Sequence, residues 1–328
     1  MQRKTVERNC GRSLGNSLVS GFFVVALLRF KLQSAGRDRS ADIDCCAANR
    51  RREFEIMKKN GEFLATLSRG LTVLRVFSRE SPEMTLSEVA VKTDLSPAVA
   101  RRCLNTLVEL GYVGKKGKLF LLTAEVLGFA SAFIESMNLE EIVQPHLQVL
   151  RDNTGDSTSL AVLSEQDILY LVHVSTHRMV RVAAGFGTRF PAHPTSMGRV
   201  LIANQPQEVV DSYLQNSDFK KLTTKTVTSR SELKRLLEQV KQQGYASVED
   251  ELDYGIVSVA VPVVDQSGKV LAAINCSTVT TRVDREQMVQ SRLQELRDAA
   301  QKIEMELRRY PVLADSIRSS AASHQTES

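Results

Sequence analysis

The sequence predicts an α+β protein, with a winged helix-turn-helix in its N-terminal half and an antiparallel sheet in its C-terminal half. Between residues 85 and 122, two amphipathic helical patterns are followed by a short hairpin pattern. From residue 157 onward, short runs rich in β-branched residues are interleaved unevenly with helical patterns, as in helices packed on an antiparallel sheet. The 328 residues are enough for two domains, each with its own core.

Two helices open the first domain. A scaffold helix is expected over residues 65–78, and Pro82 should follow its end because the residue before a proline disfavours the helical conformation. Thr85 and Glu88 have the spacing of a capping box, which predicts that a second helix begins there. The scaffold helix is expected to face the core with Leu67, Leu71, Leu74 and Phe77.

A third helix carries residues suited to DNA recognition. Ser96 can cap it, Pro97 suits its first turn, and Gly111 can end it in the left-handed conformation. Small residues at its start allow close approach to a duplex, and arginine or asparagine can pair bidentately with guanine or adenine edges. The positions expected to contact DNA are Ser96, Ala98, Arg101, Arg102 and Asn105.

A hairpin with a cationic tip is expected over residues 112–122, and its charge would suit phosphate contact. Its lysines are Lys115, Lys116 and Lys118. A solvated surface helix followed by an ordinary lysine-rich turn would give a similar pattern. The order of cap, turn, exposed arginines and basic wing favours DNA binding, and most of the net charge of +5 is concentrated in this module.

The second domain follows a linker helix expected over residues 123–138. The apolar stripe of the linker is wide, so it either completes the intrachain core or packs against a second subunit, as in a homodimer or tetramer that matches paired half-sites. Asn138 is expected to cap the helix that follows. Further helices are expected over 139–153, 196–203, 206–214, 231–243 and 284–309. Strands are expected over 157–163, 168–174, 180–184, 245–248, 256–264 and 270–277.

Both ends of the chain differ from this pattern. Residues 1–56 are rich in Arg and Ser, and we expect a disordered extension or a stretch that precedes the natural start at Met57. Its apolar run over residues 19–28 is too short to span a bilayer, and no clean signal cleavage site follows. The five cysteines lack paired spacing, which indicates a reducing cytoplasm. Residues 311–328 are expected to form a disordered tail.

No cofactor, metal or enzymatic site is expected. On a strand, His173 and His177 would lie roughly 13 Å apart, too far to share a metal with Cys276. The sequence has no glycine-flanked serine elbow, P-loop or paired His-Glu motif. The acidic cluster Asp250, Glu251 and Asp253 is interpreted as a solvated turn before a strand.

From about residue 64 to residue 309 the chain resembles the IclR family of bacterial transcription regulators. The segments that carry the resemblance are LSRGLTVLRVF (67–77), LSPAVARRCLNTLVELGYV (95–113), PTSMGRVLIA (194–203) and EDELDYGIVSVAVPVVDQSGKVLAAINCS (249–277). Within the family, TSMGR (195–199) and ARR (100–102) are similar to the branch that regulates catabolism of aromatic acids such as protocatechuate and 4-hydroxybenzoate through the β-ketoadipate pathway.

The resemblance implies a winged helix domain over residues 64–122, the linker helix, and a GAF-like effector-binding domain over residues 139–310. It places Met197 and Gly198 at the wall of the effector pocket, and it supplies the polar pocket groups Glu249, Ser258, Asn275 and Ser277. The residue chemistry adds two candidates. The Thr195 hydroxyl could bind a ring hydroxyl, and Arg181, which alternates with valines along an expected strand, could bind a carboxylate.

The expected function is a cytoplasmic DNA-binding transcriptional regulator, controlled by a small organic acid of aromatic type in its C-terminal domain. Operator DNA, the effector, a second copy of the chain and RNA polymerase are the expected partners. The alternative is a GAF-like small-molecule-binding or enzymatic protein whose winged domain serves protein contacts.

Overall fold

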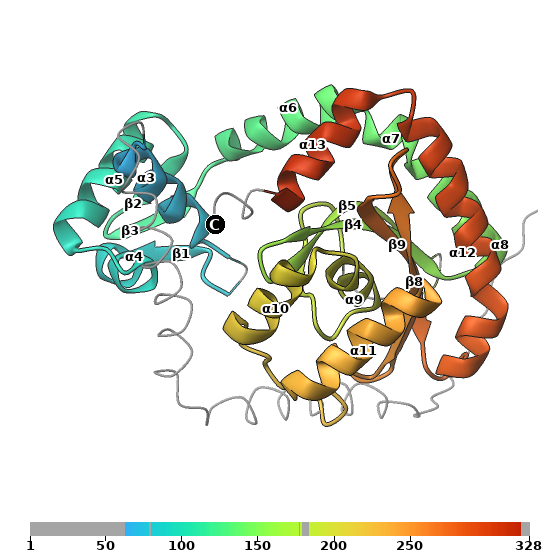
Figure 1. Ribbon diagram of the computed structural model, residues 1–328. Helices are drawn as coiled ribbons and strands as arrows, with labels where there is room; N and C mark the ends of the chain where they lie inside the picture. Colours follow the sequence, from blue (N-terminus) through green and yellow to red (C-terminus); the bar gives the residue numbers. More distant parts are fainter. Residues whose placement is uncertain (1–62, 79, 177, 179–183, 323–328) are drawn as a thin grey trace, which may run out of the picture.

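The computed structural model describes residues 63–322, apart from residues 79, 177 and 179–183. Figure 1 shows a small lobe and a larger lobe joined through one helix, α6. The extension expected over residues 1–56 and most of the strand expected over residues 180–184 lie outside the described residues. Within the described ranges, no helix has the length and apolar character needed to cross a membrane.

The small lobe is the predicted winged helix-turn-helix. It contains α3 (Ala65–Arg75), β1 (Glu83–Thr85), α4 (Leu86–Thr93), α5 (Pro97–Glu109), β2 (Val113–Lys116) and β3 (Leu119–Leu122). Both bonds of the capping box form: the Thr85 amide donates to Glu88 Oε2 at 2.7 Å, and the Thr85 hydroxyl accepts from the Glu88 amide at 3.4 Å. The Ser96 hydroxyl accepts from the Val99 amide, so the predicted cap of α5 is confirmed. Strand β1, which no pattern predicted, pairs with β3 in the order β1-β3-β2.

The predicted inward face of α3 is partly wrong. Leu74 and Phe77 pack against the core of the small lobe, as expected. Leu67 and Leu71 are 60% and 45% exposed, however, and the fully buried residue of this helix is Val73. Apolar residues occupy more than one side of α3, so their spacing alone could not decide which side meets α5.

The linker comprises η1 (Ala124–Val126) and α6 (Leu127–Met137). The single helix predicted over residues 139–153 is instead divided into α7 (Leu139–Ile142) and α8 (Gln144–Thr154). The division lies beside Pro145, which has no N–H to donate to the preceding turn. Asn138 makes no side-chain cap on α7, contrary to prediction, because it adopts the left-handed conformation (φ 50°) that ends α6.

The large lobe confirms the predicted antiparallel α+β domain, with strand order β6-β5-β4-β9-β8-β7. The strands are β4 (Ser157–Ser164), β5 (Asp167–Val174), β6 (Arg189–Pro191), β7 (Ala246–Glu249), β8 (Ile256–Val264) and β9 (Val270–Val279). One face of the sheet packs on α8, α12 (Arg285–Leu307) and α13 (Pro311–Ala322). The other face packs on α9 (Ser196–Ala203), α10 (Gln207–Asn216) and α11 (Arg230–Gln243). Figure 1 shows these two helical layers on either side of the sheet.

The expectation of a disordered tail from residue 311 is wrong for residues 311–322, which form α13. Pro311 suits the first turn of a helix, and Leu313 and Ile317 lie one turn apart on one face. Both are buried, at 2% and 1% exposure, in the apolar cluster that covers β4 and β9. The Ser- and Ala-rich composition concealed this two-residue apolar face. Residues 323–328 lie outside the described part of the chain.

Candidate DNA interface and ligand cavity

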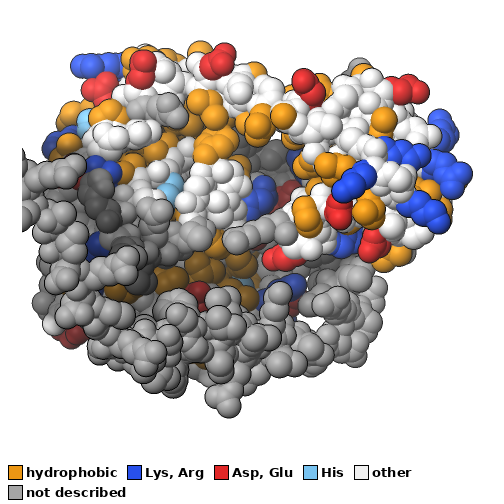
Figure 2. Space-filling view, turned by 180° about the vertical axis from the view of Figure 1, so that it is seen from behind, with side chains coloured by type: hydrophobic (Ala, Val, Ile, Leu, Met, Phe, Trp, Pro, Cys, Tyr) orange, Lys and Arg blue, Asp and Glu red, His pale blue; other side chains and the backbone are white. Residues whose placement is uncertain are grey.

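Helix α5 buries one face and exposes the residues predicted to contact DNA. Ala100, Cys103, Leu104 and Leu107 lie in the core of the small lobe. The five predicted contact residues are all exposed: Ser96, Ala98, Arg101, Arg102 and Asn105. Figure 2 shows that Lys and Arg side chains gather over this lobe. The exposed face therefore combines positive charge with side chains that can read base edges.

The wing formed by β2 and β3 adds a second cationic surface. Lys115, Lys116 and Lys118 are exposed, and Gly117 has a positive φ of 62° that suits the tight turn. The Lys115 ammonium lies 5.7 Å from the centroid of the Phe120 ring, which steadies this side chain through a cation–π contact. These lysines have the charge and exposure needed for phosphate contact.

The sheet face beneath α9 carries a band of polar residues on adjoining strands. Ser277 of β9 pairs with Ser258 of β8 on one side and with Ser157 of β4 on the other. Asn275 pairs with Ser159 of β4. Residues directly opposite one another on neighbouring strands point to the same face of a sheet. The band therefore arises from register, which joins residues of β4 to residues of β9 more than one hundred positions away.

Part of this band lines a cavity of about 30 Å³ beneath the start of α9. Five of the eight residues predicted to bind an effector line it: Thr195, Met197, Ser258, Asn275 and Ser277. The volume is comparable with the space that one water molecule takes in the liquid. Entry of an organic ligand therefore requires the walls to move apart.

One acceptor in the cavity has no protein partner. Asn275 is 4% exposed, and its Oδ1 accepts no hydrogen bond from the described residues. By contrast, the Ser258 hydroxyl lies 2.8 Å from the Ser196 hydroxyl. The Thr195 hydroxyl donates to the Ala192 carbonyl and accepts from the Gly198 amide, so it caps α9. Because buried polar atoms are usually paired, the Asn275 oxygen is suited to a hydroxyl donor on a ligand.

The sequence reasoning missed Tyr170, which also lines the cavity. Burial raises the pKa of its phenol, and a hydrogen bond with Ser159 offsets this only in part. The phenol therefore stays protonated and can donate to a ligand. In the sequence, an aromatic residue in a strand is equally consistent with a core residue and with a cavity-lining residue. Only the packing of β5 beneath α9 distinguishes these two roles.

Gly198, expected at the pocket wall, is not among the residues that line the cavity, and the backbone of Ala192 approaches it closely. A Cβ built on Gly198 would lie 2.1 Å from the Ala192 carbonyl oxygen. The glycine thus allows α9 to pack against the preceding loop and places Thr195 and Met197 over the sheet.

Gly198→Ala should therefore destabilise the large lobe by about 3 kcal/mol, the upper end of the cost of overpacking, because the clash is with backbone. A chemical denaturation curve measures this loss. Gly128→Ala is the matched control: Gly128 also lies in a helix, and a Cβ there has no neighbour within 4 Å. Equal stability of the two variants would contradict the close approach.

Glu249, predicted to be a pocket acid, does not line this cavity. Its Oε1 accepts from Lys225 Nζ at 3.0 Å, and its Oε2 accepts from the Arg285 amide at 3.0 Å. It therefore ties β7 to the start of α12. The acid that reaches the cavity is Glu251, two residues further on.

Glu251 is buried rather than part of a solvated turn, so that interpretation of the acidic cluster is wrong for this residue. Its Oε2 accepts from Arg199 at 2.5 Å and from the Val227 amide at 3.1 Å. Arg199 also donates to the His193 carbonyl at 2.9 Å. Burial lowers the pKa of His193 to about 4, although its ring also bonds to the Lys220 carbonyl. Because His193 is neutral, it adds no charge beside Arg199, and the charges of Arg199 and Glu251 balance each other.

Three further candidates stand outside this account of the cavity for different reasons. Arg181 and His177 lie outside the described residues. The His173 ring lies between the hydroxyls of Ser159 and Ser175, at 2.9 and 3.0 Å. The residues that the structure describes hold no group of three His, Cys, Asp or Glu side chains that could bind a metal ion.

Two family comparisons cover most of the described chain. Residues 66–117 match the IclR helix-turn-helix domain. Residues 131–305 match the family described as bacterial transcriptional regulator IclR C-terminal. The second match alone covers more than half of the chain, and it ends before α13.

Individual relatives agree with the family matches. The chain is 36% identical to the Pca regulon regulatory protein of Pseudomonas putida over 230 residues, which is 70% of this chain and 79% of that protein. It is 32% identical to the p-hydroxybenzoate hydroxylase transcriptional activator of Acinetobacter baylyi, covering 74% of this chain and 91% of the relative. A solved IclR homologue from Microbacterium hydrocarbonoxydans, complexed with 4-hydroxybenzoate, superposes with a TM-score of 0.62 at 26% identity and covers 75% and 100% of the two chains.

Proposed function

The chain belongs to the IclR family of bacterial transcriptional regulators, and we propose that α5 reads its operator while the cavity beneath α9 receives an aromatic hydroxy acid. The family and its relatives establish a DNA-binding regulator controlled by a small effector. The residue roles and the chemical class of the effector are the proposal. The exposed arginines of α5 support its first half, and the unpaired Asn275 oxygen supports its second.

The proposed DNA contacts divide into two kinds. Arg101, Arg102 and Asn105 read base edges from the exposed face of α5, while Ser96 and Ala98 at its start allow close approach to the duplex. The wing lysines contact phosphates and add affinity without sequence preference: Lys115, Lys116 and Lys118.

The proposed effector is an aromatic acid with a ring hydroxyl. The hydroxyl would donate to Asn275 Oδ1, which has no partner among the described residues, and would accept from Tyr170. The hydroxyls of Ser258 and Ser277 are available nearby, and Met197 supplies an apolar wall. Arg181 is proposed to bind the carboxylate. One similar structure contains 4-hydroxybenzoate, and one relative is named for the hydroxylase of that acid.

The effector proposal predicts a selective loss in Asn275→Leu. The full-length variant should bind 4-hydroxybenzoate about ten- to one-hundred-fold more weakly, because a hydrogen bond to a buried group is lost. It should bind benzoate, which lacks the hydroxyl, almost unchanged. Isothermal titration calorimetry measures both. Asn216→Leu is the control, since Asn216 is exposed at the end of α10. Equal losses for both acids would contradict the role of Asn275, and no binding of any aromatic acid would contradict the ligand class.

We also propose a homodimer or tetramer that acts in the cytoplasm and contacts RNA polymerase. Two exposed apolar faces support self-association: Leu64, Leu67 and Leu71 on and just before α3, and Leu127 and Phe129 on α6. A dimer built on these faces would present two copies of α5 to paired half-sites. A purified chain without DNA affinity that converts an aromatic acid would instead favour an enzymatic GAF-like protein.

A further inference from the structure

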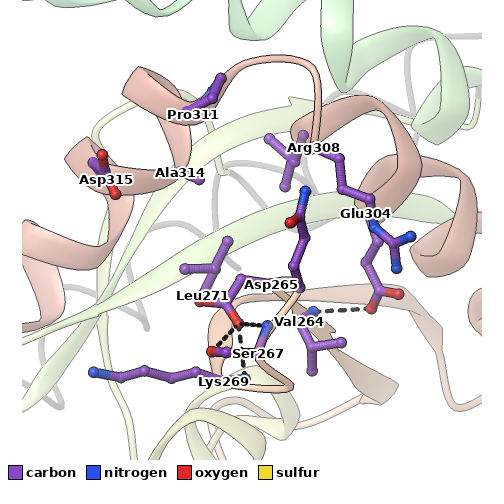
Figure 3. A pocket seen from close by; sticks show the side chains of 12 residues that line it. Val264, Asp265, Ser267, Lys269, Leu271, Glu304, Arg308, Pro311, Ala314 and Asp315 are labelled. Carbon is purple, nitrogen blue, oxygen red and sulfur yellow. Dashed lines mark hydrogen bonds between the residues drawn. The ribbon is translucent and has the colours of Figure 1, made fainter.

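A second cavity, of about 510 Å³, lies on the opposite helical layer from the effector cavity. Its walls are α12, α13 and the turn between β8 and β9, as Figure 3 shows. The volume falls within the range of about 300–1,000 Å³ that is typical of small-molecule sites. Because α13 begins after residue 305, where the family match ends, part of this wall lies outside the region shared with the family.

The floor of the cavity is apolar. Leu271 and Leu307 are buried at 2% and 3% exposure, and Ala314 and Pro311 of α13 add further apolar lining. Figure 3 shows Leu271 between the turn and α13. Contact with this floor would favour a ligand with an apolar body.

Two carboxylates at the rim accept hydrogen bonds from backbone amides. Asp265 Oδ1 accepts from the amides of Ser267 and Lys269, at 2.8 and 3.0 Å, and thereby fixes the turn. Glu304 Oε1 accepts from the Val264 amide at 2.9 Å, at the point where the β8–β9 register shifts. Both acids therefore have a structural role in holding the hairpin against α12.

The two cations at the rim, by contrast, have side chains that are available to a ligand. Within the described part of the chain, Lys269 Nζ and the Arg308 guanidinium form no ion pair or side-chain hydrogen bond. Both are exposed and line the cavity. Figure 3 shows Lys269 extending from the turn and Arg308 on α12, on different sides of the cavity, so either one can bind an anionic group by itself. The carboxylates of Asp265, Glu304 and Asp315 would repel a second anionic group.

We propose that this cavity is a second ligand site, which takes a small organic monoanion with an apolar body. The carboxylate would lie at the rim beside Lys269 or Arg308, and the apolar body would cover Leu271 and Ala314. The site shares its apolar cluster with Phe133 of the linker helix, since the cluster contains Leu313 and Ile317 of α13. A ligand that fixes the position of α13 would therefore also affect how the linker helix packs against this cluster.

The test uses 2-naphthoate as the probe and the full-length chain. Its two fused rings suit a cavity of 510 Å³, and they would require the walls of the 30 Å³ cavity to move further apart than a single-ring effector does. Naphthoate fluorescence should report saturable binding with one site per chain. The neutral isostere 2-naphthalenemethanol should bind about ten-fold more weakly, because it cannot form a charge-assisted hydrogen bond.

Variants then locate the site. Lys269→Gln combined with Arg308→Gln should weaken naphthoate binding about ten-fold or more. Ala314→Phe, which fills the apolar floor, should abolish it. The double variant Lys241→Gln, Lys302→Gln removes the same charge from exposed positions elsewhere and should leave binding unchanged. Thermal unfolding of each variant verifies that it is folded.

Three results would overturn the proposal. One is the absence of saturable naphthoate binding at millimolar concentration. Another is tighter binding of the cationic isostere 2-naphthylmethylamine, which would show that the negative charge of the rim carboxylates outweighs the positive charge of Lys269 and Arg308. The third is a loss of binding in Asn275→Leu with no loss in the Lys269 and Arg308 variant, because it would place the probe in the effector cavity.

Discussion

Removal of either arginine from the exposed face of α5 should reduce sequence-specific operator binding sharply while the fold stays intact. Arg101 and Arg102 are exposed, and the core of the small lobe is formed by the opposite face of the helix. An arginine paired bidentately with guanine contributes about 1–3 kcal/mol, so Arg102→Ala should weaken binding about ten- to one-hundred-fold at each half-site. Both replacements together should leave only non-specific affinity.

The operator for this measurement is selected from random duplexes by the wild-type chain, and affinity is then measured by fluorescence anisotropy at several salt concentrations. Lys118→Gln separates base reading from phosphate contact. It should weaken binding to all sequences alike and reduce the slope of log affinity against log salt by about one. Arg235→Ala, at an exposed position on α11, is the matched arginine control. Unchanged specific affinity in Arg102→Ala would contradict the assignment of α5 as the recognition helix.

The DNA module could be predicted from the sequence because its signals are local. The capping box at Thr85 and the cap at Ser96 each involve residues three apart, and both form as predicted. The inward face of α3 could not be predicted in the same way. Apolar residues lie on several sides of that helix, and only packing against α5 buries Val73 rather than Leu67.

The cavity depends on contacts that spacing does not reveal. Asn275 and Ser277 meet Ser159 and Ser157 through strand register, and Glu251 meets Arg199 across 52 positions. Resemblance to the family brought Asn275 and Ser277 into the expected site, but it did not separate Glu249 from Glu251. The two acids are only two residues apart, at the end of β7 and in the turn that follows. Glu249 binds Lys225, whereas Glu251 points into the interior and lines the cavity.

The same argument applies to Asp156, which no sequence pattern singled out. This carboxylate is fully buried where β4 begins, and two arginines distant in sequence bind it. Arg282 donates to Asp156 Oδ1 from the segment after β9, and Arg292 of α12 donates to Oδ2 at 2.8 Å. Both arginines also donate to the Thr154 carbonyl, at 2.7 and 3.2 Å. Asp156 and its two arginines therefore join the end of α8 and the start of β4 to α12 and to the segment after β9.

Asp156→Ala should consequently reduce the free energy of unfolding by about 3–5 kcal/mol, because it leaves two partly buried guanidinium groups without their counterion. That is a large fraction of the roughly 5–15 kcal/mol that stabilises a typical domain. Chemical denaturation of the full chain measures the loss. Asp211→Ala is the matched control, since Asp211 forms an exposed pair with Lys234 at 3.8 Å, and it should cost about 1 kcal/mol or less.

A further variant distinguishes loss of the counterion from loss of packing. Replacing the whole group, as in Asp156→Leu with Arg282→Met and Arg292→Met, removes the two unpaired charges together with the acid. It should be less destabilising than Asp156→Ala alone, because apolar side chains can fill the site of a buried ion group at little cost. If the triple variant were the less stable of the two, the hydrogen bonds from both arginines to Thr154, rather than the charge of Asp156, would hold α8 and α12 together at this point.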